Sequence, residues 1–352
     1  MPLNTTCIGA YPKPGRTGTD HWGPDQVQTG GKAGQARSFH YGAGAGGEVN
    51  ADRSDADTRA AVRDQVACGV DIPTDGEQRR ENYIHYHCHH FHGFDFEQLT
   101  RKVHRSGGAV GDLPTITGKI APKPGHFLDH DYLIAQAATE RPVKITLPGP
   151  LTIIDTTADA HYGDANALTR DLADALNYEV RALAAAGCRH IQIDEPLFAR
   201  EVDDALSFGM ECLDRCFHGL PPEVTRVMHM CCGYPGQLDE VDYPKADPGS
   251  YFALAGALDQ CAIDQISIEH AHRANEGRLL ELFARKDVIL GVVDIAISRI
   301  EPVEEIVDRL TRALEHIAPD RLIAAPDCGL PLLDRAGAMA KLTNMCIAAG
   351  LV

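Results

Sequence analysis

Apolar residues occur in short runs that alternate with longer stretches of helix-forming residues. Runs such as VILGVVDI at 288–295 are apolar at nearly every position, which is typical of strands covered on both faces of a parallel sheet. The predicted strands span residues 5–11, 69–77, 143–150, 190–197, 225–232, 265–270, 288–295 and 322–330. The predicted helices include 55–68, 165–187, 202–215, 274–286, 302–316 and 333–349.

This alternation predicts an α/β fold, a (β/α)8 TIM barrel that forms a single domain over residues 1–352. The run PTITGKI at 114–120 would be a ninth strand, and we interpret it as the arm of a local hairpin. Residues 12–55 are rich in Gly, Pro and polar residues. They predict an irregular N-terminal excursion inserted into the barrel domain.

Nearly every predicted strand ends on a residue that can carry chemistry. In a parallel barrel the carboxyl ends of the strands meet on one face, where active sites are built. We therefore expect one polar cluster on that face. Its members are Glu77, Asp194, Glu195, His229, Cys231, Glu269, Asp294, Asp327 and Cys328.

Charge and composition narrow the classes of function. The formal net charge of −17 disfavours binding to nucleic acid or to an anionic membrane surface. No run of about 18 apolar residues is present, so we expect no membrane-spanning helix. The N-terminus lacks the basic and apolar stretches of a secretory signal. With 11 scattered cysteines, this indicates a cytoplasmic protein whose reduced thiols are available as metal ligands.

The segment HYHCHHFHG at 85–93 is the conspicuous candidate for a metal site, with five histidines and one cysteine. In an extended segment, His85, His87 and His89 would share one face. However, the segment follows a strand end, in a loop or an early helix, where histidines more often serve as polar or hydrogen-bonding residues. We expect it to line the rim of the pocket.

A less conspicuous set is better matched to zinc. HMC puts His229 and Cys231 two positions apart at a strand end, so their side chains face the same way. Glu269 and Cys328 stand at two other strand ends. One imidazole, two thiolates and one carboxylate suit a tetrahedral Zn²⁺ shell, although a buried cysteine can also be a small core residue. Such a shell would hold a substrate thiol as the nucleophilic thiolate, and Glu269 would yield its place to that sulfur.

Taken in order, eight motifs resemble the catalytic domain of the cobalamin-independent methionine synthases. They are IGAYPKP, DGEQRRENY, LPGPLTI, QIDEP, HMC, SIE, GVVDI and PDCGL, and the resemblance covers about residues 7–350. The chain is closer to the compact single-barrel relatives, which include the core methionine synthases and the epoxyalkane:coenzyme M transferases, than to the larger members. The resemblance implies a zinc-dependent methyltransferase with Zn²⁺ on His229, Cys231, Glu269 and Cys328, and we expect Glu269 and Asp294 to act in catalysis.

The resemblance also implies the substrate contacts. Glu77 and Asp194 match the family's acidic contacts to the amino group of homocysteine, and two carboxylates would pair with an ammonium. The alternative is that they form structural ion pairs or hydrogen bonds. Gly9 and Ala10 would contribute backbone contacts, although Ala10 stands where the family has a serine.

Three departures concern the methyl donor. Thr156 replaces a tryptophan of the folate-dependent members, Arg200 replaces a glutamate that contacts folate, and Ala296 replaces the catalytic histidine. Thr156 and Arg200 therefore mark the donor side of the site. Release of a methyl group from N5 of a folate needs a proton on that nitrogen, which His85 or His87 would supply in place of Ala296.

Three functions stay open at this point. The first is methyl transfer to homocysteine from methyl-folate, from a methylated corrinoid or its carrier protein, or from a small methylated compound. The second is alkyl transfer to a sulfonated thiol such as coenzyme M, and the third is a non-catalytic zinc-stabilised barrel with a closed shell. Homo-oligomers are also a candidate assembly. The second function needs a cationic pocket, for which the candidates are Arg79, Arg80, Arg200 and Arg299.

Overall fold

A curved parallel sheet forms the centre of the protein in the computed structural model, which describes residues 2–13, 37–40, 51–104, 109–240 and 242–352. Its strands follow the order β1-β11-β10-β9-β8-β7-β5, and every neighbouring pair is parallel. The strands are β1 (Asn4–Thr5), β5 (Lys144–Pro148), β7 (His190–Asp194), β8 (Thr225–Met230), β9 (Gln265–Ile268), β10 (Asp287–Val293) and β11 (Leu322–Pro326).

Two isolated parallel bridges complete the circuit of the sheet. Thr6 pairs with Ile72, and Thr74 pairs with Lys144. The segment 72–74 therefore lies between β1 and β5, where the predicted second strand belongs. Eight parallel stretches in a closed order make up a (β/α)8 barrel, so the predicted fold class is confirmed.

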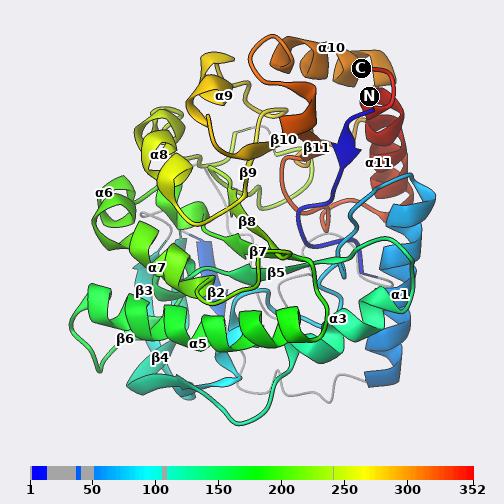
Figure 1. The fold of residues 1–352 in the computed structure, drawn as a ribbon. Coiled ribbons are helices and arrows are strands. Elements are labelled where there is room, and N and C mark those ends of the chain that lie inside the picture. The colour runs from blue at the N-terminus through cyan, green and yellow to red at the C-terminus, as the bar shows by residue number, and fades with distance from the viewer. Residues whose placement is uncertain (1, 14–36, 41–50, 105–108, 241) are drawn as a thin grey trace.

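The strands form in segments that become buried along most of their length, because both of their faces are covered. All residues of β5, β9 and β11 are buried. On the inner face, Ile8, Val227, Ile289, Ile323 and Ala325 pack into a core within the barrel. The outer face packs against the helices, which Figure 1 shows around the sheet.

Helix α5 shows how these outer helices arise from the sequence. Leu168, Leu172, Leu176 and Leu183 recur at helical spacing and are all buried. The carboxylate of Asp164 accepts hydrogen bonds from the first backbone N–H groups and caps the helix. The helices are α1 (Ala51–Ala67), α2 (His85–Cys88), α3 (Leu128–Gln136), α4 (Pro150–Asp155), α5 (Ala165–Ala185), α6 (Val202–Asp204), α7 (Met210–Cys216), α8 (Gly249–Gln260), α9 (Arg278–Leu282), α10 (Val303–Ala313) and α11 (Arg335–Ala349).

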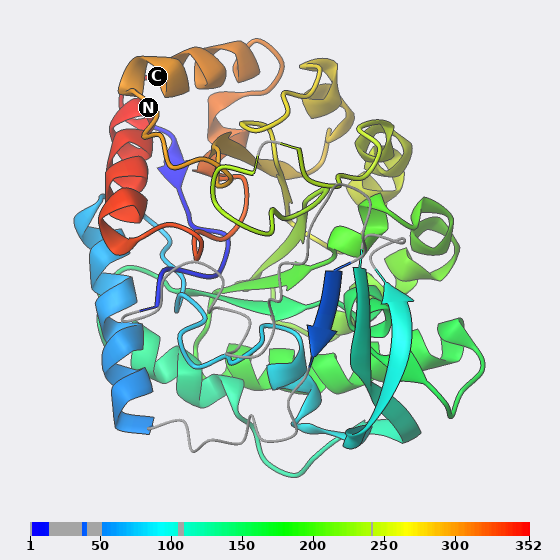
Figure 2. The ribbon, with the colours of Figure 1, turned by 180° about the vertical axis from the view of Figure 1, so that it is seen from behind.

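A second, small sheet stands beside the barrel (Figure 2). β3 (Phe91–His104) and β4 (Ala109–Pro122) form a long antiparallel hairpin, and β2 (Arg37–His40) and β6 (Ala158–Asp159) pair with β4 in parallel. PTITGKI lies within β4, so its interpretation as a hairpin arm is confirmed.

Some predicted element bounds were wrong. Helix α1 begins at Ala51, so the predicted irregular segment 12–55 ends in a helix, and its residues 14–36 and 41–50 lie outside the described residues. The predicted helix 274–286 is helical only in α9. The sequence analysis did not identify α8, GSYFALAGALDQ, because its mostly small and apolar residues leave no polar–apolar period.

No helix in the described part of the chain combines the length and apolar character that a membrane-crossing helix needs.

Candidate metal and substrate site

A pocket lies at the carboxyl ends of the barrel strands, on the face where the sequence predicted a polar cluster. Residues that follow β1, β5, β7, β8 and β11 line it. Its polar and reactive lining includes Glu77, Arg80, Asp194, Arg200, His229, Cys231, Tyr234 and Cys328.

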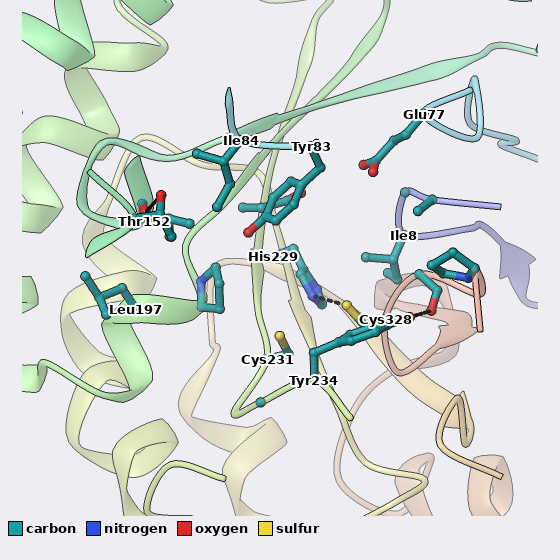
Figure 3. A pocket seen from close by; sticks show the side chains of 18 of the residues that line it. Ile8, Glu77, Tyr83, Ile84, Thr152, Leu197, His229, Cys231, Tyr234 and Cys328 are labelled. Carbon is teal, nitrogen blue, oxygen red and sulfur yellow. Dashed lines mark hydrogen bonds between the residues drawn. The ribbon is translucent and has the colours of Figure 1, made fainter. Parts of the chain in front are cut away.

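His229, Cys231 and Cys328 meet in this pocket, and their ligand atoms all lie within 4.8 Å of one another. Figure 3 shows the imidazole of His229 with the two thiols on either side. The Sγ of Cys328 is 3.5 Å from Nε2 of His229. The other ring nitrogen, Nδ1, lies 2.9 Å from Oγ of Ser267 on β9, which orients the ring and directs Nε2 towards the thiols.

The electrostatics distinguish Cys231 from the other cysteines of the chain. A hydrogen bond from Cys328, together with His229, holds the pKa of the Cys231 thiol well below its usual value. Burial raises the pKa of thiols elsewhere in the core, as it does for Cys188 and for the adjacent Cys232, to about 12 in each case. The thiolate is the form that binds a metal, and Cys231 reaches it first, because the hydrogen bond that lowers its pKa raises the pKa of its partner Cys328.

Glu269, the predicted fourth ligand, lies just after β9 but outside this three-residue cluster. Its Oε1 is 2.7 Å from Nζ of Lys245, and its Oε2 accepts a hydrogen bond from the backbone N–H of Cys232. The structure therefore brings three of the four predicted ligands together. The fourth, Glu269, is paired with Lys245 instead.

Asp294, which the sequence analysis assigned to catalysis, does not line the described pocket. Its Oδ1 accepts a hydrogen bond from the N–H of Ala296, and its Oδ2 is 3.2 Å from Nδ1 of His272. The backbone carbonyl of Asp294 also binds the buried amine of Lys341. These contacts give Asp294 a role in ordering the loop after β10, and the geometry lends no support to a direct catalytic role.

Glu77 lines the pocket from a backbone conformation that side-chain-bearing residues rarely adopt. Its φ is 55°, directly after Gly76 at 67°. A residue other than glycine in this left-handed conformation costs about 1–3 kcal/mol of folding stability, and such strained residues cluster at ligand sites. Its Oε1 accepts a hydrogen bond from Thr146 at 2.8 Å and lies 3.2 Å from Arg80. A Cβ at Gly9 would lie 2.6 Å from the same oxygen, so only glycine leaves room for this carboxylate.

Asp194 ends β7 and faces the same pocket, whereas its neighbour Glu195 turns away. The neutral amide of Gln192 donates a hydrogen bond to Oδ1 of Asp194 at 2.7 Å. Burial raises the pKa of Asp194 to about 7, and the charge of Glu77 acts in the same direction. Glu195 instead accepts hydrogen bonds from the first N–H groups of α4. Only Asp194 of this pair is therefore available to a ligand.

The donor-side residues Thr156 and Arg200 also line the pocket, as do Gly9 and Ala10. Of the four candidate arginines, Arg80 is the only other one in the lining. Arg79 pairs with Asp55 and Asp131, and Arg299 pairs with Glu305 on the surface.

Sequence reasoning missed much of the pocket wall. Tyr83 and Ile84 come from the segment before α2, and Tyr234 comes from the loop after β8. The hydroxyl of Tyr234 donates a hydrogen bond to the carbonyl of Gly329 and so joins two of the loops around the thiols. The sequence signal that could have identified Tyr83 as a pocket residue is its position six residues after Glu77.

The histidine-rich segment begins in a short helix, one of the two settings that the sequence predicted for it, but it does not line the rim of the pocket. His85 and His87 lie in α2 and are 2% and 0% exposed, and neither lines the pocket. Nε2 of His85 is 3.0 Å from the carbonyl of Thr156, and Nδ1 of His87 is 3.0 Å from that of Tyr83. Burial lowers the pKa of His85 to about 4, so its ring is neutral at neutral pH. The geometry points to packing and not to proton donation.

Replacing His85 by phenylalanine tests this conclusion. The ring volume is kept, but the carbonyl of Thr156 loses a buried partner. We expect the free energy of unfolding in urea to fall by about 1–3 kcal/mol, while kcat/KM changes less than about threefold. The exposed His92, changed in the same way, should have an effect within about 0.5 kcal/mol. Full stability with a large loss of kcat/KM would instead give His85 a catalytic role.

Comparisons with known proteins agree with this geometry. Residues 24–211 and 249–351 match the family described as the cobalamin-independent synthase catalytic domain. The methionine synthase of Saccharolobus islandicus (strain Y.G.57.14) is 31% identical over 347 residues, which cover 97% of this chain and 92% of that protein. The methionine synthase of Saccharolobus solfataricus is 30% identical over 350 residues, with the same two coverages.

A solved structure is similar along the whole chain. It is a B12-independent methionine synthase from Shewanella sp. W3-18-1 in complex with selenomethionine. The TM-score is 0.85 and the identity is 29%, over 100% of this chain and 98% of that one.

Proposed function

Because the chain belongs to the family of cobalamin-independent methionine synthase catalytic domains, we propose that it transfers a methyl group to the thiol of homocysteine with the help of zinc. The observation that carries this proposal is the convergence of His229, Cys231 and Cys328 within 4.8 Å in a pocket at the carboxyl ends of the strands.

The three residues fit a zinc ion by their chemistry. One imidazole nitrogen and two sulfurs are the soft ligands that zinc prefers, and Ser267 orients the imidazole. Three protein ligands leave a fourth position, for which the carboxylate of Glu269 would compete with a substrate. Zinc bound there would supply a positive charge that keeps a substrate thiol in its nucleophilic thiolate form at neutral pH.

The carboxylates of the pocket support an amino thiol as the acceptor. Arg80 lies against both Glu77 and Asp75, which balances its charge. Asp194 is bound by a neutral amide, so a ligand ammonium would supply the positive charge on that side. Glu77 and Asp194 would thus bind the amino group and orient the thiol towards the two cysteines.

The methyl donor would approach from the side of Thr156 and Arg200. Thr156 offers no aromatic face on which a pterin could stack. The hydroxyl of Thr156 is also used within α4, where it is 3.2 Å from the carbonyl of Thr152. Methyl-folate, a methylated corrinoid and a small methylated compound are therefore the three donors to compare.

A second acceptor class has one observation in its favour. The side chains of Lys13, Arg80 and Arg200 line the same pocket, and a cationic lining suits a sulfonated thiol such as coenzyme M. Arg80 is already balanced by two carboxylates, which favours the amino thiol.

X-ray absorption at the zinc edge tests the proposal on the purified protein. With L-homocysteine, we expect an oxygen or nitrogen ligand to be replaced by one sulfur, in addition to those of Cys231 and Cys328. Coenzyme M, added in place of homocysteine, should leave the spectrum unchanged. A response to coenzyme M alone would establish the second acceptor class. If the zinc ligands stay the same with both thiols, the site is a closed structural one, which would contradict the proposed transfer.

A further inference from the structure

Lys245 and Glu269 form a buried ion pair next to the candidate metal site. The Nζ of Lys245 is 2.7 Å from Oε1 of Glu269, and the two side chains are only 9% and 3% exposed. The same carboxylate accepts a hydrogen bond from the N–H of Cys232, the residue that follows Cys231. The carboxylate of Glu269 is therefore bound by the cation of Lys245 and by the N–H of Cys232, which follows a predicted metal ligand in the chain.

The position of Lys245 is built into the loop after β8. The N–H of Ala246 donates a hydrogen bond to the carbonyl of Cys232 at 2.7 Å, so the loop folds back onto the end of its own strand. A Cβ at Gly233 would lie 2.6 Å from the carbonyl oxygen of Pro244, so this close approach requires glycine. The loop thus carries Lys245 directly to the carboxylate.

Aromatic and polar contacts also orient the lysine. Its Nζ lies 4.9 Å from the ring centroid of Tyr243, a cation–π distance. That ring lies 4.9 Å from the ring of His272, which in turn contacts Asp294. Asp294 is thus connected to the lysine through His272 and Tyr243.

We propose that Lys245 is a positioning residue that competes with the metal for Glu269 and so keeps one coordination position open to the substrate thiol. This inference rests on the proposed function, because it takes His229, Cys231 and Cys328 as the metal ligands. A buried carboxylate that lost the cation of Lys245 would be drawn more strongly to the charge of the metal. With Lys245 present, Glu269 can leave the metal without becoming an unpaired buried charge.

Zinc affinity, measured by competition with a chromophoric chelator, tests the inference without an activity assay. We expect Lys245→Met to bind zinc about tenfold more tightly than the wild type, which corresponds to about 1.4 kcal/mol. Glu269→Gln should bind zinc more weakly. The double variant should match Glu269→Gln, because Lys245 acts only through that carboxylate.

Two further variants separate a loss of charge from a loss of structure. Lys245→Arg keeps the cation and should retain the affinity of the wild type. Lys123→Met removes a surface amine that donates a hydrogen bond to the carbonyl of His89, and it should also leave the affinity unchanged. Thermal unfolding of each variant establishes that it is folded.

The outcomes distinguish this inference from the proposed function. If Lys245→Met binds zinc no more tightly while Glu269→Gln binds it more weakly, Lys245 does not compete for the carboxylate and the inference fails alone. If Glu269→Gln has no effect, Glu269 is not a ligand and the inference also fails, although the three-residue site stands. If the wild type and Cys231→Ala bind zinc equally, the metal site itself is wrong.

Discussion

Replacing Cys231 by alanine is expected to lower zinc affinity by roughly 100-fold or more and to abolish methyl transfer. Loss of a residue that only hydrogen-bonds to a metal ligand commonly lowers metal affinity by about 10–100-fold, and Cys231 is a predicted ligand itself. It is also the thiol whose pKa the site holds well below the usual value. Zinc content after dialysis, chelator competition and the initial rate of transfer measure the effect.

The adjacent Cys232 is the matched control. It is fully buried, and burial raises the pKa of its thiol to about 12, so it stays protonated and serves as a core residue. The hydrogen bond to Glu269 comes from its backbone N–H and survives a change to alanine. Cys232→Ala should therefore lose some stability but keep its zinc. If Cys231→Ala kept as much zinc as Cys232→Ala and the wild type, the metal would be bound elsewhere.

Replacing Asp194 by asparagine is expected to lower kcat/KM for homocysteine by about 100-fold. The change removes one charge and keeps the shape and the acceptor oxygen that Gln192 binds. A desolvated carboxylate that pairs with a ligand ammonium contributes about 2–5 kcal/mol, and a 100-fold loss lies within this range. Steady-state kinetics with homocysteine as the varied substrate measure it.

A second thiol substrate makes the prediction specific to the amino group. 4-Mercaptobutyrate lacks the ammonium, so kcat/KM of the wild type for this thiol should already be low. Asp194→Asn should lower that kcat/KM little further. Asp155 also lines the pocket, on the donor side, and Asp155→Asn should change kcat/KM for homocysteine less than about threefold. An equal loss with both thiols would mean that Asp194 supports the site in general and does not bind the amino group.

The sequence predicted the barrel well because its strands carry a strong local signal. Largely apolar runs are typical of strands buried on both faces of a parallel sheet covered by helices, and β10 and β11 are such runs. The same logic placed His229, Asp194 and Cys328 at one end of the barrel, where the structure has the pocket. Elements without a clear period, such as α8, could not be recognised in this way.

The histidine-rich segment shows where local pattern fails. The sequence predicted a loop or an early helix that lines the rim of the pocket, but a helix of four residues is too short for its pattern to show which side chains are buried. Their burial in α2 depends on Phe127 and Thr156, which approach from elsewhere in the fold. Composition alone made the segment conspicuous, and only its surroundings give it a structural role.

The amino-acid sequence by itself determined the fold class, the identity of the strands and the residues at their carboxyl ends, because these follow from apolar runs and from the alternating direction of side chains in a strand. The tertiary structure alone decided which of these residues share a pocket and which are used elsewhere. It directs Asp194 to the pocket and Glu195 to a helix end, and it sets Glu269 against Lys245, which lies 24 positions earlier in an irregular loop. Such contacts between distant segments leave no periodic trace in the sequence, since they depend on how loops fold across the end of the barrel.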